Sequence, residues 1–283
     1  MIYVKYDPST FPKELRDAAQ KAQDDLEKLA THKERVAYIN ANAEVWRAFK
    51  EHLKPLSHGK CWYTESPEPA SLFDVDHFRP KAKAKRAEGD VDEGYTWLAF
   101  SPENFRYSAV RANRRTTDEE SDQVVGKGTW FPICEGSPKA HWGDRCEADE
   151  APIILDPVKR ADVELIAIKD DGWIEPNRLC FGHDRERVRL STEYLGLNLP
   201  SLTAARKRVV RSVKAACEEL IQLQVNAVET PRPGDKITVR RQLEIIRDMA
   251  GEEAPYSRAA WSVLTNHPSV LEAISAYIKT PAD

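Results

Sequence analysis

Long apolar runs are missing from this 283-residue chain. No stretch approaches the ~18 consecutive apolar residues that cross a bilayer, so we expect no membrane segment. Residues 1–11 carry charges and proline and lack the apolar core of a signal peptide. Together these absences predict a cytoplasmic protein.

Cysteine is scarce and irregularly spaced. The chain has five cysteines, which are Cys61, Cys134, Cys146, Cys180 and Cys217. No C-x-x-C pair occurs, so the spacing indicates neither a disulfide framework nor a complete zinc knuckle. We expect all of these thiols to be reduced.

A surplus of positive charge is also absent, because 46 acidic residues outnumber 42 basic ones and give a net charge of −4. A chain of this kind can bind nucleic acid only through local basic patches or with help from a partner. The phosphate-binding pattern G-x-x-x-x-G-K-[ST] does not occur, so any dependence on ATP must come from another protein.

The residues that are present predict a folded α+β protein. Hydrophobic residues make up 41% of the chain and charged residues 31%, which is typical of a globular domain. Residues 12–53 have apolar positions at helical spacing, whereas residues 60–132 contain short β-like and aromatic runs. We expect a helical segment over 1–55, a small β-containing core over 56–135, and a mostly helical region over 136–283.

Shorter elements are predicted within this frame. Residues 165–174 read as a β-hairpin around an Asp-Gly turn at Asp171 and Gly172. Residues 152–157 read as a short buried strand, and the charged stretch 81–93 as a solvated loop. A long helix is expected to begin after Ser201, which is a suitable N-cap, and to end near Val225.

Asp76 and His77 are the first candidates for chemistry, at the end of an alternating strand over 73–77. Neighbouring residues on a strand point to opposite faces, so one side chain can hold a metal while the other faces a water or a phosphate. A carboxylate suits Mg²⁺ or Mn²⁺, and an imidazole suits proton abstraction near pH 7. Asp74 shares a face with Asp76, as either a supporting group or an alternative ligand.

Several segments around Asp76 and His77 occur in a recognisable order. They are His77-Phe-Arg-Pro-Lys81, Trp97-Leu-Ala-Phe-Ser-Pro-Glu-Asn104, Ser108-Ala-Val-Arg-Ala-Asn113, Lys127-Gly-Thr-Trp-Phe-Pro132 and Ile154-Leu-Asp-Pro157. This order resembles the HNH (ββα-metal) nucleases, and most closely the PtuB-type proteins of Septu and retron-associated anti-phage defence systems. The resemblance covers about residues 61–157.

The resemblance implies a small ββα-metal core between helical segments, and it implies roles for four residues. His77 is then the general base that activates the attacking water. Asp76 and Asn113 are the ligands of one Mg²⁺ or Mn²⁺ ion, and Asn104 orients the imidazole of His77 through a hydrogen bond.

Basic side chains near these residues are candidates for contacts with nucleic-acid phosphates. The principal candidates are Arg79, Lys81, Arg111 and Arg114. Lys83, Lys85, Arg86, Arg106 and Arg115 belong to the same two basic clusters. A solvated-surface role is the alternative for Lys81.

The sequence departs from the family pattern at the zinc knuckle. Thr64 stands where a second cysteine would follow Cys61, and Ser108 and Ala112 lie where the other pair would be. Because one thiolate cannot make a four-ligand zinc site, structural zinc is not expected.

Three functions remain open at this point. The resemblance favours a DNA-cleaving endonuclease that works with an ABC/SMC-type ATPase partner similar to PtuA. The same chemistry could act on RNA or tRNA instead. A catalytically decayed binding module is the third reading, and the retention of Asp76, His77, Asn104 and Asn113 argues against it.

Overall fold

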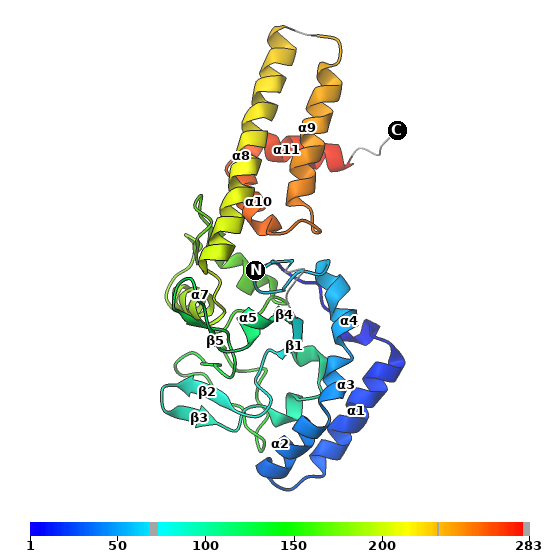
Figure 1. The fold of residues 1–283 in the computed structure, drawn as a ribbon, viewed down its shortest axis with the longest axis vertical. Coiled ribbons are helices and arrows are strands. Elements are labelled where there is room, and N and C mark those ends of the chain that lie inside the picture. Colours follow the sequence, from blue (N-terminus) through cyan, green and yellow to red (C-terminus); the bar gives the residue numbers. More distant parts are fainter. Residues whose placement is uncertain (68–72, 231, 280–283) are drawn as a thin grey trace. The chain divides into compact units, whose positions relative to one another are not determined.

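The computed structural model describes residues 1–67, 73–230 and 232–279, and these residues form two compact units. The first unit comprises residues 1–166 and 176–199, and the second comprises residues 167–175 and 200–283. Helices combined with small two-stranded sheets confirm the α+β class (Figure 1). The N-terminal helices belong to the same unit as the strands that follow them.

The first unit begins with helices. They are η1 (Pro8–Thr10), α1 (Lys13–Glu27), α2 (His32–Ala41), α3 (Ala43–Arg47), α4 (Lys50–Leu53) and η2 (Lys54–Ser57). The α2 helix begins with a capping box, in which Thr31 and Glu34 satisfy each other's backbone amides. Asn42 separates α2 from α3 because its backbone lies outside helical geometry. Its side-chain amide donates to the carbonyl of Tyr38.

Two antiparallel strands lie at the centre of this unit. The β1 strand (Phe73–His77) pairs with β4 (Phe105–Ala109), with Val75 opposite Tyr107. All five residues of β4 are buried, and the ring of Phe105 packs edge-on against Phe49 at 5.2 Å. The single helical turn α5 (Val110–Asn113) follows β4 directly. The chain therefore passes from the second strand straight into the turn that carries Asn113.

The stretch 81–93 is not the loop that its charge suggests. It forms the antiparallel pair β2 (Ala84–Ala87) and β3 (Asp90–Asp92), with Gly89 at φ +78° in the turn. Arg86 is buried, and its guanidinium pairs with Asp92 at 2.7 Å and donates to the hydroxyl of Tyr95. Because these partners neutralise the arginine, a charged sequence can form a half-buried hairpin.

The remaining elements of the first unit are short. They are η3 (Thr96–Leu98), η4 (Pro102–Asn104), β5 (Thr116–Thr117), β6 (Val124–Val125), α6 (Arg160–Glu164) and α7 (His183–Tyr194). The strand expected over 152–157 is wrong, although Ile154 and Leu155 are buried. The amide of Leu155 donates to the Ser191 hydroxyl at 2.9 Å, and proline at 152 and 157 has no amide to donate.

The second unit contains a hairpin and four helices within the described residues. The elements are β7 (Ile166–Ile168), β8 (Ile174–Pro176), α8 (Pro200–Glu229), α9 (Asp235–Ala250), α10 (Ser257–Leu264) and α11 (Pro268–Lys279); the first residue of β7 and the last of β8 belong to the first unit. The predicted hairpin at 165–174 is confirmed. Gly172, at φ +84°, lies so close to the carbonyl oxygen of Thr203 that an added Cβ would approach it to 2.1 Å.

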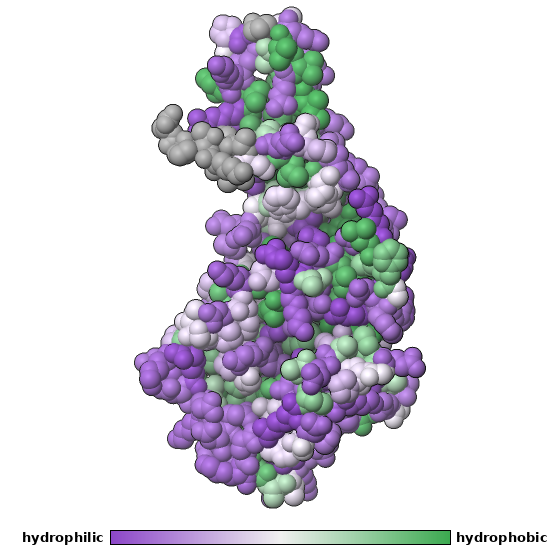
Figure 2. Space-filling model, turned by 180° about the vertical axis from the view of Figure 1, so that it is seen from behind, coloured by the Kyte–Doolittle hydropathy of each residue, from purple (hydrophilic) through white to green (hydrophobic). Residues whose placement is uncertain are grey.

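The α8 and α9 helices run side by side in opposite directions (Figure 1). The α8 helix continues to Glu229, beyond the end expected near Val225. At the joined ends of these helices Val228 is 82% exposed and Ile237 is 74% exposed, and Figure 2 shows apolar surface at this end of the unit. Among the described residues, no helix has the length and apolar character needed to cross a membrane.

Candidate functional site

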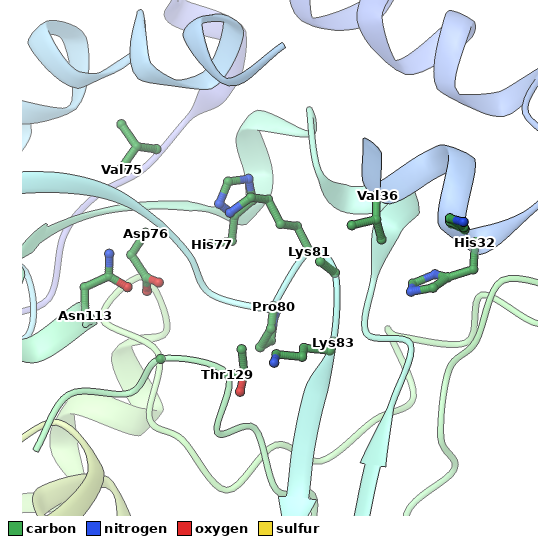
Figure 3. A pocket seen from close by; sticks show the side chains of 13 residues that line it. His32, Val36, Val75, Asp76, His77, Pro80, Lys81, Lys83, Asn113 and Thr129 are labelled. Atoms are coloured by element: carbon green, nitrogen blue, oxygen red, sulfur yellow. The ribbon is translucent and has the colours of Figure 1, made fainter. Parts of the chain in front are cut away.

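A pocket of about 620 Å³ lies in the first unit, beside the end of β1. Asp76 and His77 line it from β1, Asn113 from α5 and His32 from α2. Lys81 contributes from the segment that follows β1 (Figure 3). The pocket thus brings together four of the predicted site residues, Asp76, His77, Lys81 and Asn113, which lie up to 37 positions apart in the sequence.

The imidazole of His77 is held among aromatic rings and is only 5% exposed. The rings of Trp46 and Phe105 approach it edge-on, with centroids 5.2 and 5.3 Å away. Its Nε2 lies 2.8 Å from the carbonyl oxygen of Ala99. A carbonyl oxygen can only accept, so Nε2 carries the proton and Nδ1 is the nitrogen that can accept one.

The charge state of His77 follows from its surroundings. Burial lowers its pKa well below 6.5, and the ammonium groups of Lys81 and Lys127 lower it further. The hydrogen bond to Ala99 opposes this shift only in part. His77 is therefore neutral at pH 7, the form a general base requires.

Asn104 does not make the expected hydrogen bond to His77. Its Oδ1 accepts from the amide of Arg79 at 2.7 Å, and its Nδ2 donates to the carbonyls of Arg79 and Leu98 at 2.9 and 3.3 Å. Both ends of the side chain are thus used to hold the main chain that follows β1. The carbonyl of Ala99 orients the imidazole instead. Every residue has a backbone carbonyl, so the sequence could not have identified this contact.

Asp76 is 3% exposed, and both of its oxygens have buried partners. The ammonium of Lys127 lies 2.8 Å from Oδ1, and the hydroxyl of Tyr63 donates to Oδ2 at 2.7 Å. Burial raises the pKa of Tyr63 well above 10, so its hydroxyl stays protonated and remains a donor. Tyr63 and Lys127 were not assigned to the site from sequence, although Lys127 lies within a motif of the resemblance.

Asn113 is oriented by a neighbour on β1. Its Nδ2 donates to Asp74 Oδ2 at 3.1 Å, and Arg114 binds both oxygens of Asp74 at 2.7 Å. Figure 3 shows the amide oxygen of Asn113 directed toward the carboxylate of Asp76. Of the two readings open for Asp74, this geometry favours a supporting role over direct metal ligation.

The two proposed ligands, Asp76 and Asn113, offer oxygen atoms, which suit Mg²⁺ or Mn²⁺ better than zinc. Asp76 offers a carboxylate and Asn113 an amide oxygen, so an ion held here would take its remaining ligands from water and substrate. In the described part of the chain, no three His, Cys, Asp or Glu residues cluster as a metal site. The sulfur of Cys61 accepts from the amide of Ala109 at 3.2 Å. The expectation of no structural zinc stays a prediction.

The expected phosphate contacts divide into two groups. Lys81 lines the pocket, with Nζ 4.9 Å from the centroid of a Trp46 ring. Arg111 and Arg114 are exposed, but they already pair with Asp118 and Asp74.

For Arg79, Arg86 and Arg106, the structure does not favour the expected contact with phosphate. The guanidinium of Arg79 is 3.2 Å from Glu150 and donates to the carbonyl of Glu147 at 2.6 Å, so it is committed to the interior. Arg106 is buried against Asp156 with two hydrogen bonds of 2.8 Å, and Arg86 is buried as described above. The guanidinium groups of these three arginines are held by carboxylates and carbonyls of the fold, and none of the three lines the pocket.

Comparison of the sequence with known proteins assigns no family to the chain. No protein-family model matches the chain, and no curated protein matches its sequence. The chemistry of the pocket residues therefore carries the functional conclusion.

Proposed function

We propose that this chain is a metal-dependent endonuclease of the HNH type, which hydrolyses phosphodiester bonds in nucleic acid. One observation carries the proposal. A pair of antiparallel strands and the helical turn after them bring a neutral imidazole, a carboxylate and an amide oxygen to one pocket. The imidazole can act as a general base, and the two oxygens can hold a divalent cation that activates a phosphodiester.

Each residue has a distinct part in the proposed reaction. His77 accepts a proton from the attacking water at Nδ1, while the bond from Nε2 to Ala99 fixes the tautomer. Asp76 and Asn113 hold the divalent cation, and Asp74 fixes the amide of Asn113. A bound Mg²⁺ or Mn²⁺ supplies Lewis acidity that polarises the phosphate and stabilises the departing 3′ oxyanion.

Lys81 is the proposed phosphate contact within the pocket. The described residues place no carboxylate within ion-pair distance of its ammonium. Burial lowers its pKa, and the negative charge of Asp76 opposes that shift. An ammonium that lacks a fixed counter-ion is suited to pair with the phosphate of a substrate.

DNA is the favoured substrate, with RNA as the alternative, and a partner ATPase is part of the proposal. The chain carries a net charge of −4, and only part of the basic set faces the pocket. Its own attraction for a polyanion is therefore weak. An ABC/SMC-type ATPase similar to PtuA, acting with this chain in cytoplasmic anti-phage defence, would supply the missing nucleic-acid binding.

The test is cleavage of DNA and RNA in Mg²⁺ or Mn²⁺, with and without the partner ATPase. Replacing His77 by alanine should lower the rate by ~10²–10⁴-fold while nucleic-acid binding is kept. The exposed His52, which does not line the pocket, provides the control, and His52→Ala should cleave at the wild-type rate. Full activity of a folded His77→Ala variant would contradict the assignment of the base.

A further inference from the structure

Lys127 joins the two elements that carry the proposed metal ligands. Its side chain is fully buried, and its ammonium donates to the carbonyls of His77 and Phe78, the latter at 3.0 Å. The same ammonium pairs with Asp76. One cation therefore holds the end of β1 and the carboxylate on it.

The backbone of the same segment holds α5. The amide of Lys127 donates to the carbonyl of Ala112 at 2.9 Å, and the amide of Gly128 donates to the carbonyl of Asn113 at 2.6 Å. Side chain and backbone at 127–128 thus fix both proposed ligands, which come from different elements. This arrangement links β1 to α5, the two elements that carry Asp76 and Asn113.

The position of Lys127 also affects the charge that Asp76 presents to the pocket. Asp76 lines the pocket, whereas Lys127 is fully covered and reaches Oδ1 from the interior. An ion pair of 2.8 Å in a buried site is poorly screened by water. The negative charge of Asp76 is therefore largely balanced before any cation arrives, and Asn113 adds no charge.

We propose that Lys127 makes metal binding depend on nucleic acid. By balancing the charge of Asp76, it keeps the affinity of the free protein for a divalent cation low. The phosphate of the bound nucleic acid then provides the negative charge that completes the site. This inference rests on the proposed function. It means that the protein assembles its active metal centre only when nucleic acid is bound.

Calorimetric titration of Mn²⁺ into the full chain without nucleic acid tests the proposal. Lys127→Gln keeps a donor for the carbonyls but removes the charge, and its affinity for Mn²⁺ should rise about tenfold or more. Lys127→Arg keeps the charge and should bind as weakly as wild type. The double variant Lys127→Gln with Asp76→Asn should lose the gain. Unchanged affinity in folded Lys127→Gln would overturn the proposal.

A second measurement covers the case in which Lys127→Gln does not fold. In a His77→Ala background, which prevents cleavage, a DNA oligonucleotide should tighten binding of Mn²⁺, and equal affinity with and without DNA would overturn the inference.

The two proposals fail in different ways. If Asp76→Asn leaves binding of Mn²⁺ in the presence of DNA unchanged, the metal site of the proposed function is wrong. If Asp76→Asn weakens that binding while Lys127→Gln leaves the free affinity unchanged, only the role of Lys127 is wrong.

Discussion

At the scale of single residues, burial decides what each polar group in the pocket can do. His77 is enclosed by Trp46 and Phe105, which keeps the ring neutral, and the carbonyl of Ala99 fixes its tautomer. Asp76 is equally covered, and Lys127 and Tyr63 bind its two carboxylate oxygens. The same burial thus lowers the pKa of His77 by desolvation and encloses Asp76 together with two hydrogen-bonding partners.

The low pKa of His77 makes the stability of the fold depend on pH. In the unfolded chain the imidazole titrates near 6.5, whereas in the folded protein its pKa is well below that value. The unfolded state therefore binds the proton first as pH falls. The contribution of His77 to stability is complete above about pH 6.5 and is lost as pH falls toward the folded pKa, by at most ~1.4 kcal/mol per pH unit.

Urea unfolding from about pH 7.5 to about pH 5.5 measures this dependence. Wild type should lose stability more steeply than His77→Gln over that range. The control His52→Gln changes an exposed histidine and should keep the wild-type slope. Parallel curves for wild type and His77→Gln would show that His77 is not desolvated in the folded protein.

At the scale of elements, the site depends on a very short helix. The α5 helix has four residues, and a single turn has no stability of its own in water. It is held because β4 leads directly into it and because the amides at 127–128 bind its last carbonyls. The loop around Gly126 is therefore as much a part of the site as the strands.

Gly126 provides a sharp test of that loop. It has φ +93°, and an added Cβ would approach the carbonyl oxygen of Arg114 to 1.9 Å, a backbone atom that cannot rotate away. Gly136 has φ +77° with no atom near an added Cβ, so Gly136→Ala measures the conformational cost alone, of order 1–2 kcal/mol.

Gly126→Ala should lower the free energy of unfolding by at least ~1–3 kcal/mol more than Gly136→Ala does, because overpacking adds to the cost of positive φ. It should also weaken binding of Mn²⁺ in the presence of nucleic acid, since Asn113 shifts with the loop. Urea unfolding and calorimetry give the two readouts. Equal destabilisation by Gly126→Ala and Gly136→Ala would mean that the loop around Gly126 can change conformation at little cost and does not fix α5.

At the scale of the whole molecule, the chain forms two compact units. The proposed catalytic residues lie in the first unit, together with α1 to α4. The second unit is built on α8 and α9, whose joined ends expose Val228 and Ile237. Each unit has its own buried core, so each should unfold in its own step.

Paired substitutions test this independence. Arg106→Met leaves Asp156 buried without its partner and should destabilise the first unit by ~3–5 kcal/mol. Leu220→Ala removes a fully buried side chain of α8 and should destabilise the second unit by ~2–5 kcal/mol. Hydrogen exchange should accelerate in β4 for the first variant and in α9 for the second. Loss of protection in both units from either change would show one cooperative unit.

The sequence by itself determined the features that depend on neighbouring residues. The α+β class, the strand ending in Asp76 and His77, and the hairpin at Gly172 follow from local periodicity and turn chemistry. Such features need only residues a few positions apart, and the structure confirms them. The nuclease assignment also came from local motifs, and it stays a proposal.

Only the tertiary structure decided which polar groups face the pocket. Arg79 meets Glu150, which is 71 positions away, and Arg106 meets Asp156, which is 50 away. The contact from Ala99 to His77 uses a backbone carbonyl. Lys127, which pairs with Asp76, is 51 positions further along the chain. The sequence alone does not distinguish an arginine that forms an interior ion pair from one that contacts a phosphate. The difference lies in which distant carboxylate the fold brings beside each.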